Sequence, residues 1–199
     1  MEGIPDESTV AKAAELSVFD STGSQVKFGD LFKDKKTIVV FIRHFFCGSC
    51  QAYVSQLASV KQEALDAAGV QLVVVGCGSH EPIANYASLT GFRAGAIYAD
   101  PARALFRLFG FPENLALTPA GEQRKSYLAG RSFIGNALSS IWNGLKAPHH
   151  LGKQGNLSQL GGEFIFGPGN QCTYASRMKH TEDHIEVADL MKEAGVEYP

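Results

Sequence analysis

Two continuous runs of apolar residues, at 37–42 and 70–75, stand on either side of a segment with a different periodicity. Such runs, rich in β-branched residues and without alternation, are typical of strands covered on both faces. Between them, apolar residues recur at spacings of three and four, which predicts one amphipathic helix over 48–68 capped by Gly69. Those apolar positions are Tyr53, Val54, Leu57, Val60, Ala64, Leu65 and Ala68. Strand, helix and strand in this order predict a βαβ unit with a parallel strand pair.

The rest of the chain predicts shorter elements around this unit. Residues 1–14 are polar and are expected to be loose or to form a short docking helix. The segment 111–162 is turn-rich apart from a helix around 133–145, and we interpret it as an insertion, a lid or a pocket wall. In chain order, the other expected elements are a strand over 16–20, a helix over 82–90, a strand over 97–99, a helix over 101–109, a hairpin over 163–175 and a last helix over 182–194.

This order of elements is the skeleton of a thioredoxin-like α/β fold, with a central mixed sheet flanked by helices and an insertion around 111–162. The length of 199 residues predicts one domain over 1–199. The 18 basic residues against 20 acidic ones give a net charge of −2 without a basic stripe, so nucleic-acid binding is not expected.

Neither a membrane nor an oxidising compartment is indicated by the sequence. The longest clean apolar run, 38–42, is far shorter than a membrane span. The first residues lack the pattern of a signal peptide, and four unevenly spaced cysteines do not form a secreted disulfide framework. We therefore expect a cytoplasmic protein with reduced cysteines.

The most informative motif is Cys47-Gly48-Ser49-Cys50, which lies between a predicted buried strand and the first turn of the predicted helix. Unpaired N–H groups and the helix dipole at that position favour a thiolate, the nucleophile of disulfide exchange and peroxide reduction. A second thiol three residues on is within reach to close a disulfide. Arg43 and His44 could add positive charge beside the sulfurs, or could equally be structural residues that form ion pairs or hydrogen bonds. The motif predicts a redox-active pair.

A zinc site is a competing interpretation, because Cys47, Cys50, Cys77 and His80 supply four ligands in two close pairs. It would require both pairs to converge within a few ångströms, and the metal would quench the nucleophile. We therefore prefer the interpretation that Cys77 is a packed residue at a strand end.

The remaining cysteine and two histidines have simpler interpretations. Free cysteines are often buried hydrophobes, and Cys172 is expected to belong to the core. His180 and His184 have helical spacing, but the acid between them is wrongly placed for a His-Glu-x-x-His site. We interpret these two histidines as a solvated face and a helix start.

Several segments resemble the peroxiredoxin-like 2 group, the AhpC/TSA antioxidant-like proteins. The resemblance spans about residues 16–195. It is carried by Phe41-Ile42-Arg43-His44-Phe45-Phe46-Cys47-Gly48-Ser49-Cys50, by Val73-Val74-Val75-Gly76-Cys77-Gly78, by Ile97-Tyr98-Ala99-Asp100-Pro101 and by Leu160-Gly161-Gly162-Glu163-Phe164-Ile165-Phe166-Gly167-Pro168-Gly169-Asn170. It implies a thioredoxin-like fold and a thiol-based oxidoreductase, commonly presumed antioxidant. One branch of the wider group reduces prostaglandin endoperoxides.

The resemblance leaves the order of the two cysteines open. In thioredoxin-like proteins with this motif the first cysteine attacks, which would make Cys47 the nucleophile and Cys50 the resolving residue. In typical peroxiredoxins the cysteine at the position of Cys50 attacks the peroxide. This chain has Arg43 where their proline stands, and Gly161-Gly162 where they carry an arginine that polarises the peroxide. The thioredoxin cis-proline before that strand is also missing. These departures favour slower or different chemistry.

The sequence therefore predicts a thiol oxidoreductase that needs no bound cofactor and no metal. Its expected partners are a small oxidised molecule, a peroxide, endoperoxide or disulfide, and an external thiol reductant of the thioredoxin or glutathione type; a homodimer is possible. The alternative is a thioredoxin-like scaffold that binds a small apolar ligand, or performs non-redox chemistry, in a pocket walled by 111–162. Aromatic residues that could line such a pocket, or simply pack in the core, are Phe45, Phe46, Phe111, Phe133 and Trp142.

Overall fold

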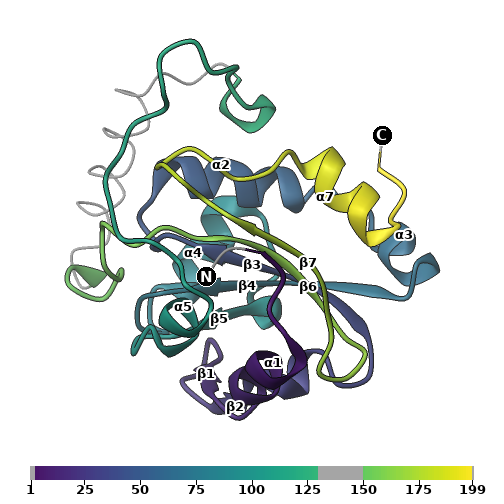
Figure 1. Cartoon of the computed structure of the whole chain (residues 1–199). Coiled ribbons are helices and arrows are strands. Elements are labelled where there is room, and N and C mark those ends of the chain that lie inside the picture. The colour runs from purple at the N-terminus through teal and green to yellow at the C-terminus, as the bar shows by residue number, and fades with distance from the viewer. Residues whose placement is uncertain (1–2, 130–149, 199) are drawn as a thin grey trace.

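A computed structural model describes residues 3–129 and 150–198 of the chain. The described residues form a seven-stranded sheet in the order β2-β1-β5-β4-β3-β6-β7 (Figure 1). The strands are β1 (Ser17–Phe19), β2 (Gln25–Lys27), β3 (Lys36–Ile42), β4 (Val70–Gly76), β5 (Ile97–Ala99), β6 (Gly162–Phe166) and β7 (Cys172–Arg177). Strands β3, β4 and β5 run parallel, and the other neighbours pair antiparallel. The mixed sheet expected from the sequence is present.

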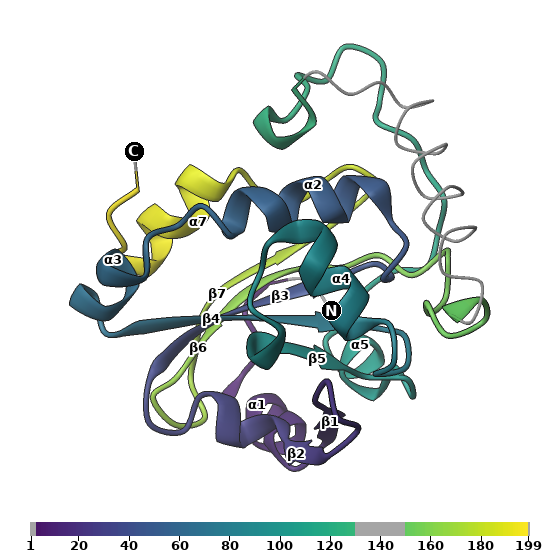
Figure 2. The ribbon, with the colours of Figure 1, turned by 180° about the vertical axis from the view of Figure 1, so that it is seen from behind.

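Helices cover both faces of this sheet. They are α1 (Glu7–Ala14), η1 (Phe28–Leu31), α2 (Gly48–Leu57), α3 (Gln62–Ala67), α4 (Ile83–Thr90), η2 (Ala94–Ala96), α5 (Ala104–Leu108), η3 (Ser126–Leu128) and α7 (Val187–Ala194). Figures 1 and 2 show α2, α3 and α7 on one face, with α1 on the opposite face. The parallel pair β3 and β4 is joined through α2 and α3, so the βαβ unit is confirmed.

The core on the α1 side of the sheet consists largely of phenylalanine rings. Phe41 of β3 contacts five rings: Phe28, with centroids 6.1 Å apart, and four others with centroids 5.0 to 5.8 Å apart. These four are Phe106, Phe109, Phe111 and Phe164. Rings packed edge to face at this spacing add to the stabilisation from burial. The central strand that leads to Cys47 is therefore firmly held on this face.

The helix predicted over 48–68 is in fact two helices, and this prediction was wrong. The chain leaves helical geometry after Leu57 and re-enters it at Gln62, with Lys61 in an extended conformation. The hydroxyl of Ser59 donates to the carbonyl of Gln56 at 2.7 Å and helps to end the first helix. Apolar periodicity continues through the break because both helices pack on the same sheet face, so the pattern alone could not show it.

Smaller differences concern element ends. The N-terminal segment is a docked helix, in which Asp6 caps α1 and Val10 is fully buried. The last helix begins at Val187 rather than 182, and the helix expected over 101–109 covers 104–108. Strand β2 was not predicted. The helix expected around 133–145 lies outside the described residues.

Candidate active site

The cysteine motif lies where β3 ends and α2 begins, as the sequence predicted. After Ile42 the chain crosses four residues and enters α2 with Cys47 as its N-cap. Phe45 fixes this crossing: its N–H donates to the carbonyl of Gln154 at 3.0 Å, and its ring lies on the end of β4. A Cβ at Gly76 would come within 2.5 Å of that ring, so glycine is needed for the close approach.

The sulfur of Cys47 is surrounded by hydrogen-bond donors. The N–H of Cys50 points at it from 3.4 Å, in the manner of a capping side chain. Nη1 of Arg43 donates to it from 3.5 Å, and the hydroxyl of Ser49 lies 3.1 Å away. Donors on several sides are what a thiolate requires when water is excluded.

These contacts give the two thiols different pKa values. Burial alone would raise the pKa of Cys47, but a hydrogen bond from the Cys50 thiol, the charge of Arg43 and the Ser49 hydroxyl together hold that pKa well below the usual value for cysteine. Burial and the neighbouring Cys47 sulfur raise the pKa of Cys50 well above it. The arrangement therefore favours ionisation of Cys47 over ionisation of Cys50.

Arg43 and His44 both lie at the site, but they differ in charge. Burial lowers the pKa of His44 to about 4, so its imidazole is neutral near pH 7 and cannot add the positive charge that the sequence suggested. Among the described residues its Nδ1 has no hydrogen-bond partner. Arg43 supplies the charge and is held in place by donating from Nη2 to the carbonyl of Leu157 at 2.8 Å.

Both sulfurs are enclosed: Cys47 is 3% exposed and Cys50 is fully buried. Part of the enclosure is the loop between β7 and α7, residues 180–186, which we call the cover segment. The hydroxyl of Ser49 donates to the carbonyl of Thr181 in this segment at 3.1 Å. The same hydroxyl therefore contacts the Cys47 sulfur and the segment that closes the site.

The cover segment is held by residues 116–128, which are one piece of the described part of the predicted insertion, 111–129 and 150–162. Thr181 donates its N–H to the carbonyl of Ala116 at 3.0 Å. The Tyr127 hydroxyl donates to the carbonyl of Glu182 at 2.7 Å and accepts the N–H of His184 at 3.1 Å. This part of the expected insertion acts as a second layer over the active site.

A buried acid–base pair under α2 was missed by the sequence analysis. Glu163 of β6 and His184 of the cover segment are both fully buried, with Oε1 and Nδ1 2.5 Å apart. The imidazole stacks on Tyr53, which lies one turn after Cys50, with ring centroids 4.3 Å apart. The interpretation of His184 as solvated was therefore wrong. An isolated glutamate within an otherwise apolar strand was the signal that could have identified the pair.

The zinc interpretation is not supported by the geometry. Cys77 is buried, its thiol donates to the carbonyl of Arg43 at 2.8 Å, and burial raises its pKa to about 12. His80 lies beside Glu81 instead, with Nδ1 3.7 Å from the carboxylate. Cys77 is thus the packed residue at a strand end that we expected. Within the described ranges, the four proposed ligands do not gather into a metal-binding group.

One other cluster of possible ligands consists of Glu122, His180 and Asp183. Nε2 of His180 lies 3.1 Å from Glu122 and 3.8 Å from Asp183, and Lys125 pairs with Asp183 at 3.8 Å. Ion pairs between residues 116–128 and the cover segment account for this cluster. His180 is 4% exposed, so it too is buried rather than solvated.

The remaining candidates are core residues or lie outside the described structure. Phe45, Phe46 and Phe111 are buried, and Cys172 is half-buried against the core. Phe133 and Trp142 fall in 130–149, outside the described residues. A pocket walled by them is therefore neither supported nor contradicted.

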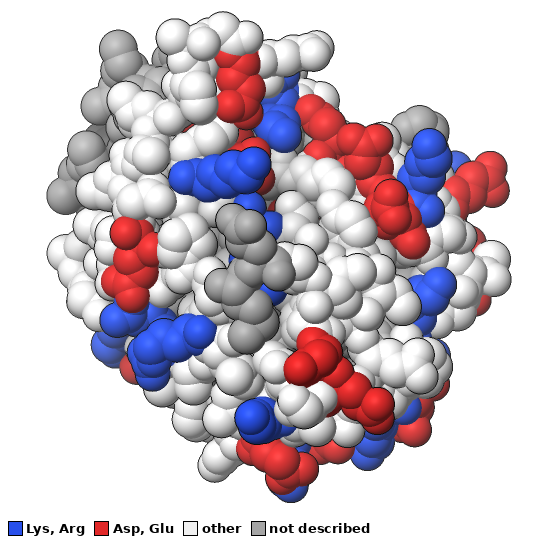
Figure 3. Space-filling view, viewed as in Figure 1, with Lys and Arg blue, Asp and Glu red and all other residues white. Residues whose placement is uncertain are grey.

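The surface agrees with the mixed charge of the sequence. On the face shown in Figure 3, acidic and basic side chains of the described residues are interspersed rather than gathered by sign. Within 3–129 and 150–198, no helix has the length and apolar character that crossing a bilayer requires.

Comparison with known sequences identifies a matching family model and several similar proteins. The family model described as AhpC/TSA antioxidant enzyme matches residues 56–180, a range that begins after the cysteine pair. Human "Peroxiredoxin-like 2C" is 34% identical over 190 residues, covering 94% of this chain and 81% of that protein. A "Prostamide/prostaglandin F synthase" of Salmo salar is 25% identical over 175 residues, covering 86% of this chain and 80% of that protein.

Comparison with solved structures confirms the fold. A mutant of peroxiredoxin 6 from Arenicola marina superposes with a TM-score of 0.57 at 13% identity, covering 91% of this chain and 69% of that one. Identity this low supports the architecture and nothing about substrate. The thioredoxin-like α/β fold expected from the sequence is thus confirmed.

Proposed function

The chain belongs to the peroxiredoxin-like 2 group of the AhpC/TSA family, and from this premise we propose a thiol oxidoreductase in which Cys47 attacks and Cys50 resolves. The observation that carries the proposal is the Cys47 sulfur, with Arg43 at 3.5 Å, Ser49 at 3.1 Å and the Cys50 N–H at 3.4 Å. It favours the thioredoxin-like order of the two cysteines over the order in typical peroxiredoxins, because the buried thiol of Cys50 keeps its proton.

The first step uses the ionised sulfur as nucleophile. The Cys47 thiolate attacks one oxygen of a hydroperoxide, the O–O bond breaks, and the leaving alkoxide takes a proton to become an alcohol. Cys47 becomes a sulfenic acid and the peroxide is reduced by two electrons. Arg43 is then the one cation, among the described residues at the sulfur, that can stabilise the departing oxygen.

In the second step the two cysteines form a disulfide. The Cys50 thiol gives up its proton and attacks the sulfur of the Cys47 sulfenic acid, releasing water and forming the disulfide. Two thiols of an external reductant of the thioredoxin or glutathione type then restore both cysteines and are themselves oxidised to a disulfide. An endoperoxide would form a different intermediate. The Cys47 thiolate would attack one ring oxygen, the O–O bond would break, and the product would stay bonded to Cys47 as a sulfenate ester, with its other oxygen protonated to a hydroxyl. Attack of the Cys50 thiol on that sulfur would then form the disulfide and release the second oxygen as a hydroxyl, without release of water.

The substrate class rests on the relatives. The salmon relative is named a prostamide/prostaglandin F synthase, which makes an endoperoxide a candidate beside hydroperoxides. No bound cofactor enters these steps, because the thiols carry both electrons. Cytoplasmic location stays a prediction, and so does a homodimer.

Because the Cys47 sulfur is buried, this chemistry requires a movement that lets the substrate reach it. A substrate can reach the 3%-exposed sulfur when Thr181 and its neighbours in the cover segment move away from Ser49. We expect turnover to be limited by this opening and therefore to be slower than the attack of an exposed thiolate.

Single-turnover oxidation of Cys47→Ser and Cys50→Ser variants tests the proposal. With hydrogen peroxide, tert-butyl hydroperoxide and a model disulfide as separate oxidants, the Cys50→Ser variant should be oxidised once at Cys47 and then stop. The Cys47→Ser variant should not react at Cys50. Mass spectrometry of the intact protein, with a sulfenic-acid trap, reads out both.

Cys172→Ser is the matched control, because this half-buried cysteine lies in β7 and burial raises its pKa to about 11. It should react like the wild type. If both active-site variants were oxidised as fast as the wild type with every oxidant, the proposal would be wrong.

A further inference from the structure

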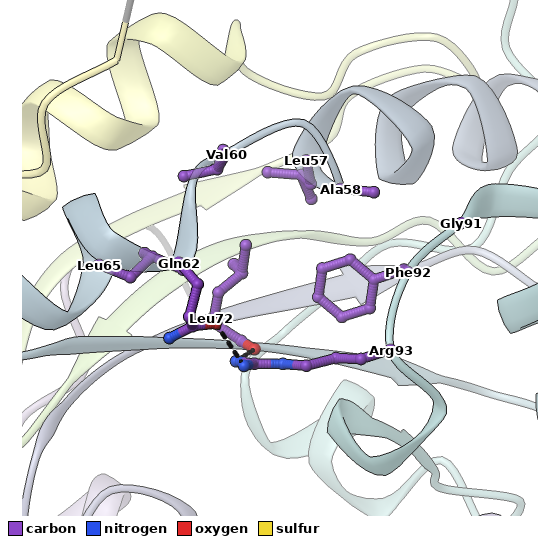
Figure 4. Close-up of a pocket in the computed structure, with 9 residues that line it drawn as sticks. All are labelled: Leu57, Ala58, Val60, Gln62, Leu65, Leu72, Gly91, Phe92 and Arg93. Carbon is purple, nitrogen blue, oxygen red and sulfur yellow. Dashed lines mark hydrogen bonds between the residues drawn. The ribbon is translucent and has the colours of Figure 1, made fainter.

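The break between α2 and α3 leaves a hollow at the far end of α2 from the cysteines. It has a volume of about 270 Å³, and α2, α3, β4 and the loop after α4 form its walls. Figure 4 shows the Phe92 ring and the side chain of Leu72 reaching into the space below Leu57. The residues around it are Leu57, Ala58, Val60, Gln62, Leu65, Leu72, Gly91, Phe92 and Arg93. Five of these carry large apolar side chains, and the accessible lining of the hollow is about equally apolar and polar.

One charged group lies at this hollow. The guanidinium of Arg93 is held by two hydrogen bonds, from Nη1 to the Gln62 amide oxygen at 2.6 Å and from Nη2 to the carbonyl of Leu72 at 3.3 Å (Figure 4). These bonds use two of its five N–H donors. Within the described ranges, Arg93 forms no salt bridge with a carboxylate. An exposed but positioned cation, without a salt-bridge partner among the described residues, therefore borders the hollow.

We propose that this hollow binds a small amphiphilic carboxylate, with its alkyl chain against Leu57, Leu65 and Phe92 and its carboxylate at Arg93. Apolar side chains together with a few polar groups, here Gln62 and Arg93, are the usual composition of a small-molecule site. The sign of the charge selects an anion, and the planar guanidinium fits a carboxylate.

The dimensions limit the ligand. A volume of 270 Å³ is slightly below the roughly 300 Å³ at which drug-sized pockets begin, so the hollow suits a medium-length alkyl chain rather than a whole lipid. The ten residues of α2 put roughly 15 Å between this hollow and the start of the helix at Cys47. The site is thus separate from the thiols and does not depend on the proposed redox function.

Titration with octanoate, followed by two-dimensional NMR of the reduced protein, tests the proposal. We expect saturable shift changes at Leu57, Leu72 and Phe92. Octanol and octylammonium, which share the chain but lack the negative charge, should bind at least about five-fold more weakly. Arg93→Gln should weaken octanoate about five-fold and leave octanol unchanged.

Two further variants separate binding from folding. Ala58→Phe fills the hollow without removing Arg93 and should abolish saturable binding of octanoate. Ala67→Phe places the same ring on an exposed position of α3 outside this hollow and should bind octanoate like the wild type. The proposal is overturned if octanoate causes no saturable shifts, if octylammonium binds as tightly, or if Ala58→Phe binds octanoate unchanged.

Discussion

The two ends of α2 are built in opposite ways. At the beginning of the helix a charged sulfur is enclosed by Arg43, Ser49 and the cover segment, each at hydrogen-bonding distance from the sulfur or from another member of the group. At its end the helix stops and leaves a hollow, lined by apolar and polar groups, open beside Arg93. Both ends contain an arginine, but one guanidinium contacts a buried sulfur whose pKa it lowers, and the other forms no salt bridge among the described residues.

The difference shows what a buried charge demands from a fold. A thiolate out of water needs donors on several sides, and at Cys47 they all come from residues 43–50. Distant segments hold two of these donors in place, through the carbonyls of Leu157 and Thr181. An apolar surface needs no such partners and can be left partly uncovered at modest cost. Substitutions at the closed end should therefore have larger effects than equivalent substitutions elsewhere.

The largest effect is expected for the acid–base pair under the closed end. Glu163→Ala leaves the buried imidazole of His184 without its partner and should lower the free energy of unfolding by about 3 kcal/mol. Glu63→Ala, at an exposed position of α3 near the open end, should change it by less than about 0.5 kcal/mol. Urea denaturation measures both. Equal effects would contradict the contrast between the two ends.

A smaller effect concerns stability in acid. The unfolded chain protonates His44 near pH 6.5, whereas the folded protein resists protonation until about pH 4. The free energy of unfolding should therefore decrease as pH falls through this window, and at pH 5 the loss from this residue is about 2 kcal/mol. Denaturant unfolding of His44→Leu should show a decrease in the free energy of unfolding at pH 5 that is smaller by this amount.

His80→Leu is the control for the acid effect, because its side chain is partly exposed. This variant should lose as much free energy of unfolding in acid as the wild type does. An unchanged acid loss in His44→Leu would mean that His44 is not a buried neutral group.

The charge of Arg43 should be visible in the reactivity of Cys47. Arg43→Met removes the cation beside the sulfur, raises the pKa of Cys47 and should slow its alkylation by iodoacetamide at pH 7 by about ten-fold or more. Arg107→Met, on the exposed side of α5, should not change the rate. Peptide mass spectrometry assigns the modified cysteine, and a rate unaffected by Arg43→Met would exclude Arg43 as the stabilising group.

The smallest effect is expected for Ser49. The Ser49 hydroxyl has a single proton, which lies within hydrogen-bond distance of both the Cys47 sulfur and the Thr181 carbonyl. Ser49→Ala removes this shared donor and should reduce the thiolate fraction at a pH near the Cys47 pKa by at most about three-fold. Ser55→Ala, in the same helix but exposed, should leave it unchanged. The same variant frees the Thr181 carbonyl, so amide hydrogen exchange in the cover segment should become faster. Exchange unchanged by Ser49→Ala would contradict the link between site and cover.

Local sequence patterns predicted most of the fold and the centre of the site. Continuous apolar runs identified β3 and β4, and the cysteine spacing identified the residues that meet at the start of α2. Periodicity could not detect the break after Leu57, because helices on one sheet face share one apolar pattern.

Contacts between distant segments could not be predicted from the sequence. Thr181 is 132 positions from Ser49, and Glu163 is 21 from His184, so nothing local marks either pair. The charge of His44 was also misjudged, because burial by distant segments decides it. Polar residues that become buried through long-range packing are where sequence reasoning failed in this protein.

Ultraviolet titration of thiolate absorbance in the reduced protein tests the assignment of the two cysteines most directly, because it does not depend on access to the buried sulfurs. We predict an ionisation well below the usual cysteine range in the wild type, which is lost in Cys47→Ser and retained, at a somewhat higher pH, in Cys50→Ser. A low-pH ionisation that survives in Cys47→Ser, or none below the range of free cysteine in the wild type, would contradict Cys47 as the resident thiolate.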